Sequence, residues 1–131
     1  MKIKLSVVLI LLGAFFLITG CSDSVSSFEE GFFTDTKGSY SFVLIANEGE
    51  LAKVEEKWTN ITSNQIKRLK NENPNNDYRI VVHDLSFKEI QKILKRHGME
   101  NKKYTVLVYE LDNVIFKSTS IEEYERFVNE F

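Results

Sequence analysis

The chain has 131 residues, of which 43% are hydrophobic, 27% charged and 12% aromatic, as in an ordinary globular protein. One proline and six glycines exclude a collagen-like or Pro/Gly-rich disordered chain, and one cysteine excludes an intrachain disulfide or a zinc site built on several cysteines. The sequence has 17 basic and 19 acidic residues, and two of the basic ones, Lys2 and Lys4, belong to the export segment described next. Without them, 15 basic residues stand against 19 acidic ones, which is a net charge of −4. This charge argues against a nucleic-acid partner and against general attraction to anionic lipid head groups.

The first twenty residues have the pattern of an export signal. Lys2 and Lys4 give a positive start, and the fourteen residues 5–18 carry no charge. A stable membrane anchor needs ~20 apolar residues to cross a ~30 Å hydrocarbon core, so this run is too short. It is typical of the apolar centre of a secretory signal. We therefore expect residues 1–20 to be a signal peptide, which leaves 131 less 20, or 111, residues.

The signal ends at residues 17–21 in Leu-Ile-Thr-Gly-Cys, which resembles the lipobox of bacterial lipoproteins. The resemblance implies that the chain is cut before Cys21, that Cys21 carries a diacylglycerol, and that the protein is anchored on the outer face of the bacterial cell membrane. Two acyl chains give stable attachment, because each buried CH₂ contributes ~0.8 kcal/mol. The alternatives are an ordinary N-terminal membrane helix, or a signal cut elsewhere that leaves Cys21 as a free thiol.

Residues 21–38 are expected to form a lipid-anchored tether, because serines and acidic residues are frequent in them. Phe28, Phe32 and Phe33 do not suit a pure spacer. One interpretation is that they dock on the domain as a lid or an extra strand. The other is that they form a segment that binds a partner or dips into the membrane, which makes Phe32 and Phe33 candidate partner-binding residues.

Residues 39–131 alternate strand and helix signals and are predicted to be one domain. The nearly continuous apolar run 40–46 is typical of a strand covered on both faces. Apolar residues at helical spacing predict a helix over about 50–71, bent near 59–63, with Trp58 in the core. Further strands are expected at residues 79–83, 104–109 and 114–116.

Two helix starts and one hairpin complete the predicted elements. Ser86 and Ser120 are each followed three residues later by Glu, which is the pattern of a capping box. The first of these helices is expected to end at Gly98. The three residues before it are basic and suit the negative end of a helix: Lys95, Arg96 and His97. Asp112-Asn113 predicts a hairpin turn between the last two strands.

The resulting order, βαβαββα, predicts an α/β fold with a mixed four-stranded sheet and helices on both faces. It resembles the thioredoxin fold over residues 39–131, and most closely in the closing ββα, formed by residues 104–109, 114–116 and the helix that begins at Ser120.

The chain departs from thioredoxins at their reactive positions. Thioredoxins carry a Cys-x-x-Cys pair where the first helix begins, whereas residues 47–51 here are Asn-Glu-Gly-Glu-Leu. The family also places a cis-proline just before the third strand. In this sequence the residue nearest to that position is Tyr104, and the one proline, Pro74, lies elsewhere. Disulfide exchange needs an attacking thiolate, so we expect a redox-inactive protein that is not an enzyme and has no cofactor beyond its acyl anchor.

The resemblance implies a groove between the loop at the start of the first helix and the loop before the third strand, where thioredoxins accept extended polypeptide. The residues here would be Asn47, Glu48, Gly49, Lys103 and Tyr104. We therefore expect a lipid-anchored accessory or binding protein of the cell envelope. An envelope protein or peptide is the first partner hypothesis, and peptidoglycan is the second.

The alternative function is a thiol-independent enzyme or a metal-binding protein that uses Glu48, Glu50, His83 and Asp84. Paired carboxylates can perform acid–base chemistry or bind calcium. A simpler interpretation is that Glu48 and Glu50 stabilise a helix N-terminus, while His83-Asp84 orients the loop after a strand. No metal site is expected on that interpretation.

Overall fold

The structure is a computed structural model that describes residues 25–131, so that the export segment and Cys21 lie outside the described residues. Its four strands form one mixed sheet in the order β2-β1-β3-β4. Strand β1 (Tyr40–Ala46) pairs in parallel with β2 (Tyr78–Asp84) and antiparallel with β3 (Tyr104–Glu110), and β3 pairs antiparallel with β4 (Asn113–Ser118).

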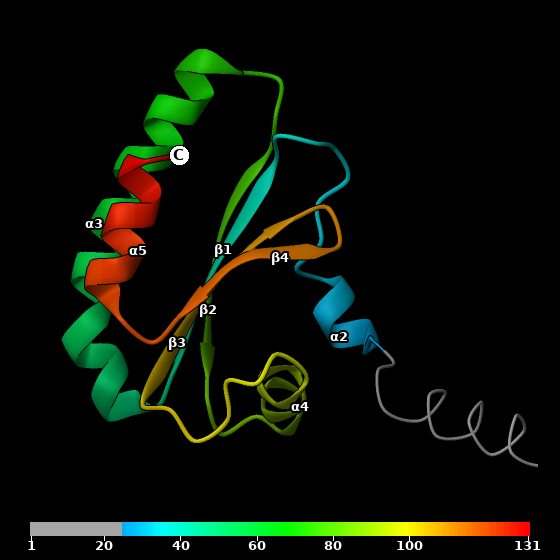
Figure 1. Cartoon of the computed structure of the whole chain (residues 1–131), viewed down its shortest axis with the longest axis vertical. Coiled ribbons are helices and arrows are strands. Elements are labelled where there is room, and N and C mark those ends of the chain that lie inside the picture. Colours follow the sequence, from blue (N-terminus) through cyan, green and yellow to red (C-terminus); the bar gives the residue numbers. More distant parts are fainter. Residues whose placement is uncertain (1–24) are drawn as a thin grey trace, which may run out of the picture.

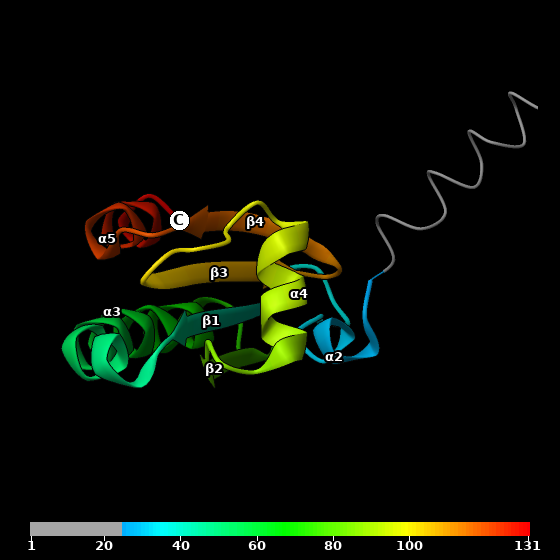
Figure 2. The ribbon, with the colours of Figure 1, turned by 90° about the horizontal axis from the view of Figure 1, so that it is seen from below.

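Helices cover both faces of this sheet. Helix α3 (Glu48–Glu72) and helix α5 (Ile121–Asn129) pack on one face, and α4 (Lys88–Arg96) lies on the other together with the short helix α2 (Ser27–Glu30). The three layers are visible in Figures 1 and 2. The predicted α/β class, its thioredoxin-like βαβαββα order and the mixed four-stranded sheet are therefore confirmed.

Each central strand supplies both halves of the core. Because successive side chains of a strand point to opposite faces, Phe42 and Leu44 of β1 pack under α3 and α5, while Val43 and Ile45 pack under α4. Trp58 is fully buried in the first half, as predicted. Burial on both faces explains why β1 and β3 have nearly continuous apolar sequences.

The segment before β1 packs on the sheet. Ser26 caps α2 by accepting a hydrogen bond of 3.1 Å from the Glu29 N–H. Phe32 is only 4% exposed and lies in the half of the core under α4. Residues 26–38, grouped with the tether on sequence grounds, thus dock on the domain, which is the first of the two interpretations left open above.

Two helix starts differ from the sequence pattern. Helix α3 begins at Glu48, with Asn47 as its cap, and runs unbroken for 25 residues, so that no interruption divides it near residues 59–63. Helix α4 begins only at Lys88, with Phe87 at the cap position and no side-chain cap. The predicted capping box at Ser86 is wrong, because the Ser86 N–H donates to Asp84 Oδ1 at 2.7 Å and closes a turn instead.

The second predicted capping box holds in one direction. Ser120 Oγ accepts a hydrogen bond of 3.3 Å from the Glu123 N–H. The Glu123 carboxylate does not return to the Ser120 N–H, because Ser118 lies between them: its hydroxyl donates to Glu123 Oε2 and accepts from the Ser120 N–H at 3.0 Å.

Among the described residues, no helix combines the length and the apolar character needed to cross a membrane.

Candidate functional site

The two loops expected to border a binding groove lie together at one end of the sheet. Ala46, the last residue of β1, pairs with Tyr104, the first residue of β3. Asn47 directly follows Ala46, and Lys103 directly precedes Tyr104, so the two loops lie side by side. The Asn47 side chain accepts a hydrogen bond of 2.9 Å from the Glu50 N–H, so its oxygen is occupied in capping α3.

Tyr104 has a structural role in this surface. Its hydroxyl accepts a hydrogen bond of 2.8 Å from the Ile121 N–H at the start of α5, and its ring packs against the core under α3 and α5. The Tyr104 side chain is therefore fixed by contacts within the domain. Asn47, Glu48, Gly49 and Lys103 are exposed, and these four residues make the accessible part of the predicted surface.

The residues of the alternative enzyme or metal hypothesis do not gather into a metal site. His83 and Asp84 are neighbours on β2, so their side chains point to opposite faces of the sheet. Asp84 accepts the hydrogen bond from the Ser86 N–H that turns the chain towards α4, as the simpler interpretation predicted. Within residues 25–131, no group of three or more His, Cys, Asp or Glu side chains could hold a metal ion.

His83 belongs to an aromatic surface. Its ring centroid lies 5.3 Å from that of Phe28, 5.5 Å from that of Phe32 and 6.5 Å from that of Phe87. Burial lowers the pKa of His83 below its ordinary value, because desolvation disfavours the charged imidazolium. The ring is therefore neutral at pH 7 and packs as a largely apolar group.

A buried carboxylate that the sequence did not indicate lies beside this surface. Glu29 of α2 is 1% exposed. Its Oε1 accepts a hydrogen bond of 2.8 Å from Arg96 Nε, and its Oε2 accepts a second one from Arg96 Nη2. Tyr109 Oη donates to the same Oε2 at 3.1 Å, and His97 Nε2 lies 2.8 Å from it. We call these four residues the Glu29 cluster.

The electrostatics of the Glu29 cluster favour the ionised form of the carboxylate. Burial alone would raise the pKa of Glu29, but the hydrogen bonds from Arg96 and His97 outweigh it and hold that pKa below the ordinary value. Burial, followed by the adjacent Glu29 charge, raises the pKa of the Tyr109 hydroxyl. Both carboxylate oxygens are occupied by donors, so the cluster fastens α2 to α4 and β3 and offers no free base for chemistry.

Sequence reasoning missed Glu29 because its partners are distant along the chain. Arg96 and His97 were explained by the negative end of α4, and that position is observed, since His97 is the C-terminal cap residue. The available signal was the aromatic run around Glu29. That run holds two acidic residues, Glu29 and Glu30, and whichever of them is buried when the run docks on a core needs a cationic partner.

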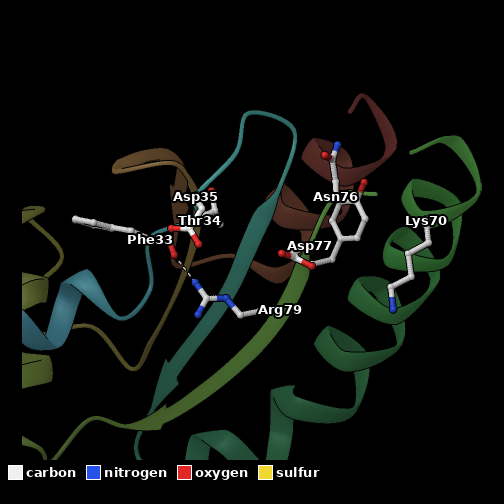
Figure 3. A pocket seen from close by; sticks show the side chains of 8 residues that line it. Phe33, Thr34, Asp35, Lys70, Asn76, Asp77 and Arg79 are labelled. Carbon is white, nitrogen blue, oxygen red and sulfur yellow. Dashed lines mark hydrogen bonds between the residues drawn. The ribbon is translucent and has the colours of Figure 1, made fainter. Parts of the chain in front are cut away.

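A hollow lies at the opposite end of the β1–β2 pair, where the segment before β1 crosses β2. It has a volume of about 350 Å³, and its lining residues are Phe33, Thr34, Asp35, Lys70, Asn76, Asp77, Tyr78 and Arg79. Figure 3 shows Arg79 reaching from β2 to the carbonyl oxygen of Phe33; a second bond, of 3.1 Å, reaches the Gly31 carbonyl. The Arg79 guanidinium thus holds the docked segment in place.

The two aromatic residues proposed as partner-binding have different environments. Phe32 is buried, and its ring lies 5.6 Å from that of Tyr109, so it is a core residue and is withdrawn from the partner-binding set. Phe33 is partly buried, with its ring 6.0 Å from that of Tyr109, and borders the hollow. The driving force for both is burial of apolar area against the sheet.

Comparison of the chain with protein-family models, with curated proteins and with solved structures gave no match in any of the three.

Proposed function

We propose that the chain is a lipid-anchored, extracytoplasmic accessory protein of the bacterial cell envelope that binds an extended polypeptide and catalyses no thiol chemistry. The observation that carries the proposal is the lipobox-like sequence ending at Cys21, followed within a few residues by a domain of thioredoxin-like fold. The one cysteine of the sequence is taken by the anchor in this proposal. The domain then has no thiolate for disulfide exchange.

The proposed partner surface consists of Asn47, Glu48, Gly49 and Lys103, which are exposed. It corresponds to the region where thioredoxins accept extended polypeptide, and the pairing of Ala46 with Tyr104 places its two loops side by side. Asn47 also caps α3, and the partly buried Tyr104 supports this surface by bonding the start of α5. Charges of both signs favour a peptide of mixed polarity over a strongly charged polymer.

Replacing Cys21 with alanine is expected to move most of the protein from the membrane fraction to the medium, because the two acyl chains are its main proposed attachment. The measurement is immunoblotting of membranes and culture medium, with incorporation of an alkyne-tagged fatty acid as a second readout. Ser22→Ala is the matched control and should stay in the membrane fraction and incorporate the label. A Cys21→Ala protein that remained in the membrane fraction would contradict the anchor.

Photo-crosslinking in cells tests the partner surface. A photoreactive amino acid at Glu48 or Lys103 is expected to trap one defined protein band. The same group at Asn75, an exposed position in the loop before β2, is the control and should trap none. A defined band from Phe28 together with none from Glu48 or Lys103 would place the binding element in the docked N-terminal segment and contradict the proposed surface.

A further inference from the structure

Two exposed phenylalanines, Phe28 and Phe87, both lie against the ring of His83, and Val25 is a further exposed apolar residue near the start of α2. Phe28 is 37% exposed, Phe87 58% and Val25 38%. The rings of Phe28 and Phe87 both contact the ring of His83, so the three aromatic groups form one continuous surface. Val25 precedes the Ser26 cap of α2. We call Phe28, His83 and Phe87 the aromatic patch.

The aromatic patch belongs to one side of the molecule. Helix α2 carries Phe28, and Phe87 is the cap residue of α4. Figures 1 and 2 both show these helices near each other, with α3 and α5 beyond the sheet. Another exposed apolar residue, Ile80, neighbours Val81 on β2 and so points to the face opposite His83. It provides a comparison outside the patch.

The aromatic patch lies very close along the chain to the proposed lipid. Val25 is four positions after Cys21, which is at most ~14 Å of fully extended chain, and Phe28 is seven positions after it, at most ~25 Å. A diacylglycerol at Cys21 would therefore keep Val25, just before α2, within ~14 Å of the lipid surface. The fastened α2 passes this constraint to the domain, because the Glu29 cluster ties it to α4 and β3.

The chemistry of the patch also suits a lipid interface. Aromatic side chains with an exposed apolar edge are favoured at the boundary between head groups and acyl chains. The His83 ring between the two phenylalanines is neutral at pH 7, because its pKa is lowered by burial. Helix α4, which begins beside Phe87, exposes Lys88, Lys92 and Lys95, of which Lys92 lies 3.4 Å from Glu89. These lysines can contact lipid phosphates locally, although the net charge of the protein gives no general attraction to anionic lipid.

Resting on the proposed lipid anchor, we infer that the aromatic patch is a membrane-contacting surface: Phe28 and Phe87 insert into the head-group region of the bilayer that holds Cys21. This contact fixes the orientation of the domain, with α2 and α4 facing the membrane and α3 and α5 facing away. The protein would then present its proposed partner surface in one orientation and would not swing freely on a tether.

Fluorescence quenching by lipids tests this orientation on the lipidated protein. Because Cys21 is acylated, a cysteine introduced elsewhere is the only free thiol to label. Ser86→Cys places a fluorophore beside Phe87 on an exposed residue, and Asn71→Cys places it on the exposed side of α3. Both proteins are reconstituted in vesicles of phosphatidylethanolamine and phosphatidylglycerol that contain head-group-quencher lipids.

We expect quenching at position 86 to exceed that at position 71 by about twofold or more, with a blue shift of emission at position 86 alone. Equal quenching at the two positions, in protein that floats with the vesicles, would overturn the membrane-contacting surface and leave the anchor intact. Protein that does not float would overturn the anchor and the surface together.

A second variant distinguishes the effect of the aromatic patch from the effect of the short chain between Cys21 and α2. Phe28→Ser with Phe87→Ser, introduced into the Ser86→Cys protein, is expected to lose most of the quenching and the blue shift while still floating with the vesicles. Circular dichroism before reconstitution checks that the variant is folded. Unchanged quenching in a folded variant would show that proximity alone orients the domain and would overturn the role of the two phenylalanines.

Discussion

Replacing Glu29 with alanine is expected to lower the free energy of unfolding by about 3 kcal/mol, which is near the lower end for breaking a buried ion pair. The substitution removes the acceptor shared by Arg96, His97 and Tyr109. The cost is at the lower end because the Arg96 side chain is 24% exposed, so that water can solvate part of its charge. Urea unfolding of residues 25–131, followed by circular dichroism, measures the change.

The neighbouring residue provides the control for this prediction. Glu30 is exposed on the same short helix, so Glu30→Ala is expected to change the stability by less than about 0.5 kcal/mol. If the two alanine variants unfolded at the same urea concentration, the Glu29 cluster would not fasten the segment. Glu29→Gln should fall between wild type and Glu29→Ala, because an amide retains one acceptor oxygen and loses the charge.

The same carboxylate gives the stability a defined pH dependence. The pKa of Glu29 is lower in the folded state than its ordinary value of 4.5, so between the two values the unfolded chain binds more protons than the folded one. Stability from ionised Glu29 is therefore complete above about pH 4.5 and is lost as the pH falls through the folded-state value. The difference between wild type and Glu29→Gln should shrink over that range.

Replacing Phe32 with alanine is expected to lower the free energy of unfolding by about 3–4 kcal/mol. Phe32 is 4% exposed and packs with Tyr109 and His83, so its removal leaves a cavity between the docked segment and the sheet. Thermal unfolding of residues 25–131 should show a clear decrease in midpoint. An effect of this size would show that the segment before β1 is a structural part of the domain.

Phe87 provides the matched control for Phe32, because it is the same residue type at an exposed position. At 58% exposed, it has little area to lose, and Phe87→Ala is expected to cost less than about 1 kcal/mol. Equal losses for the two variants would contradict the difference in burial on which the prediction depends.

The strands and the order of the elements could be predicted because their signals are local. The apolar sequences of β1 and β3 indicated strands buried on both faces, and the structure places both at the centre of the sheet. Ser120 was recognised as a helix cap from four consecutive residues. These signals depend on side-chain spacing alone, so they do not need the tertiary structure.

Features that depend on distant residues could not be predicted in the same way. Ser86 had the pattern of a helix cap, but Asp84 competes for its N–H and closes a turn. The docking of residues 26–38 depends on Arg96, Tyr109 and Arg79, which lie more than 40 residues away. The two loops expected to border a groove do lie side by side, but the sequence did not show that Asn47 and Tyr104 are occupied by hydrogen bonds within the domain.

The fastening of the docked segment has a mechanical consequence. Thr34 exchanges hydrogen bonds of 3.1 Å and 2.6 Å with Leu111 in the β3–β4 turn, while Arg79 holds the same segment from β2. A pulling force applied at the N-terminal end would therefore load α2 and these attachments before it reached β1. The attachments would break first, and the segment of about a dozen residues that they release would lengthen the connection while the sheet stayed folded.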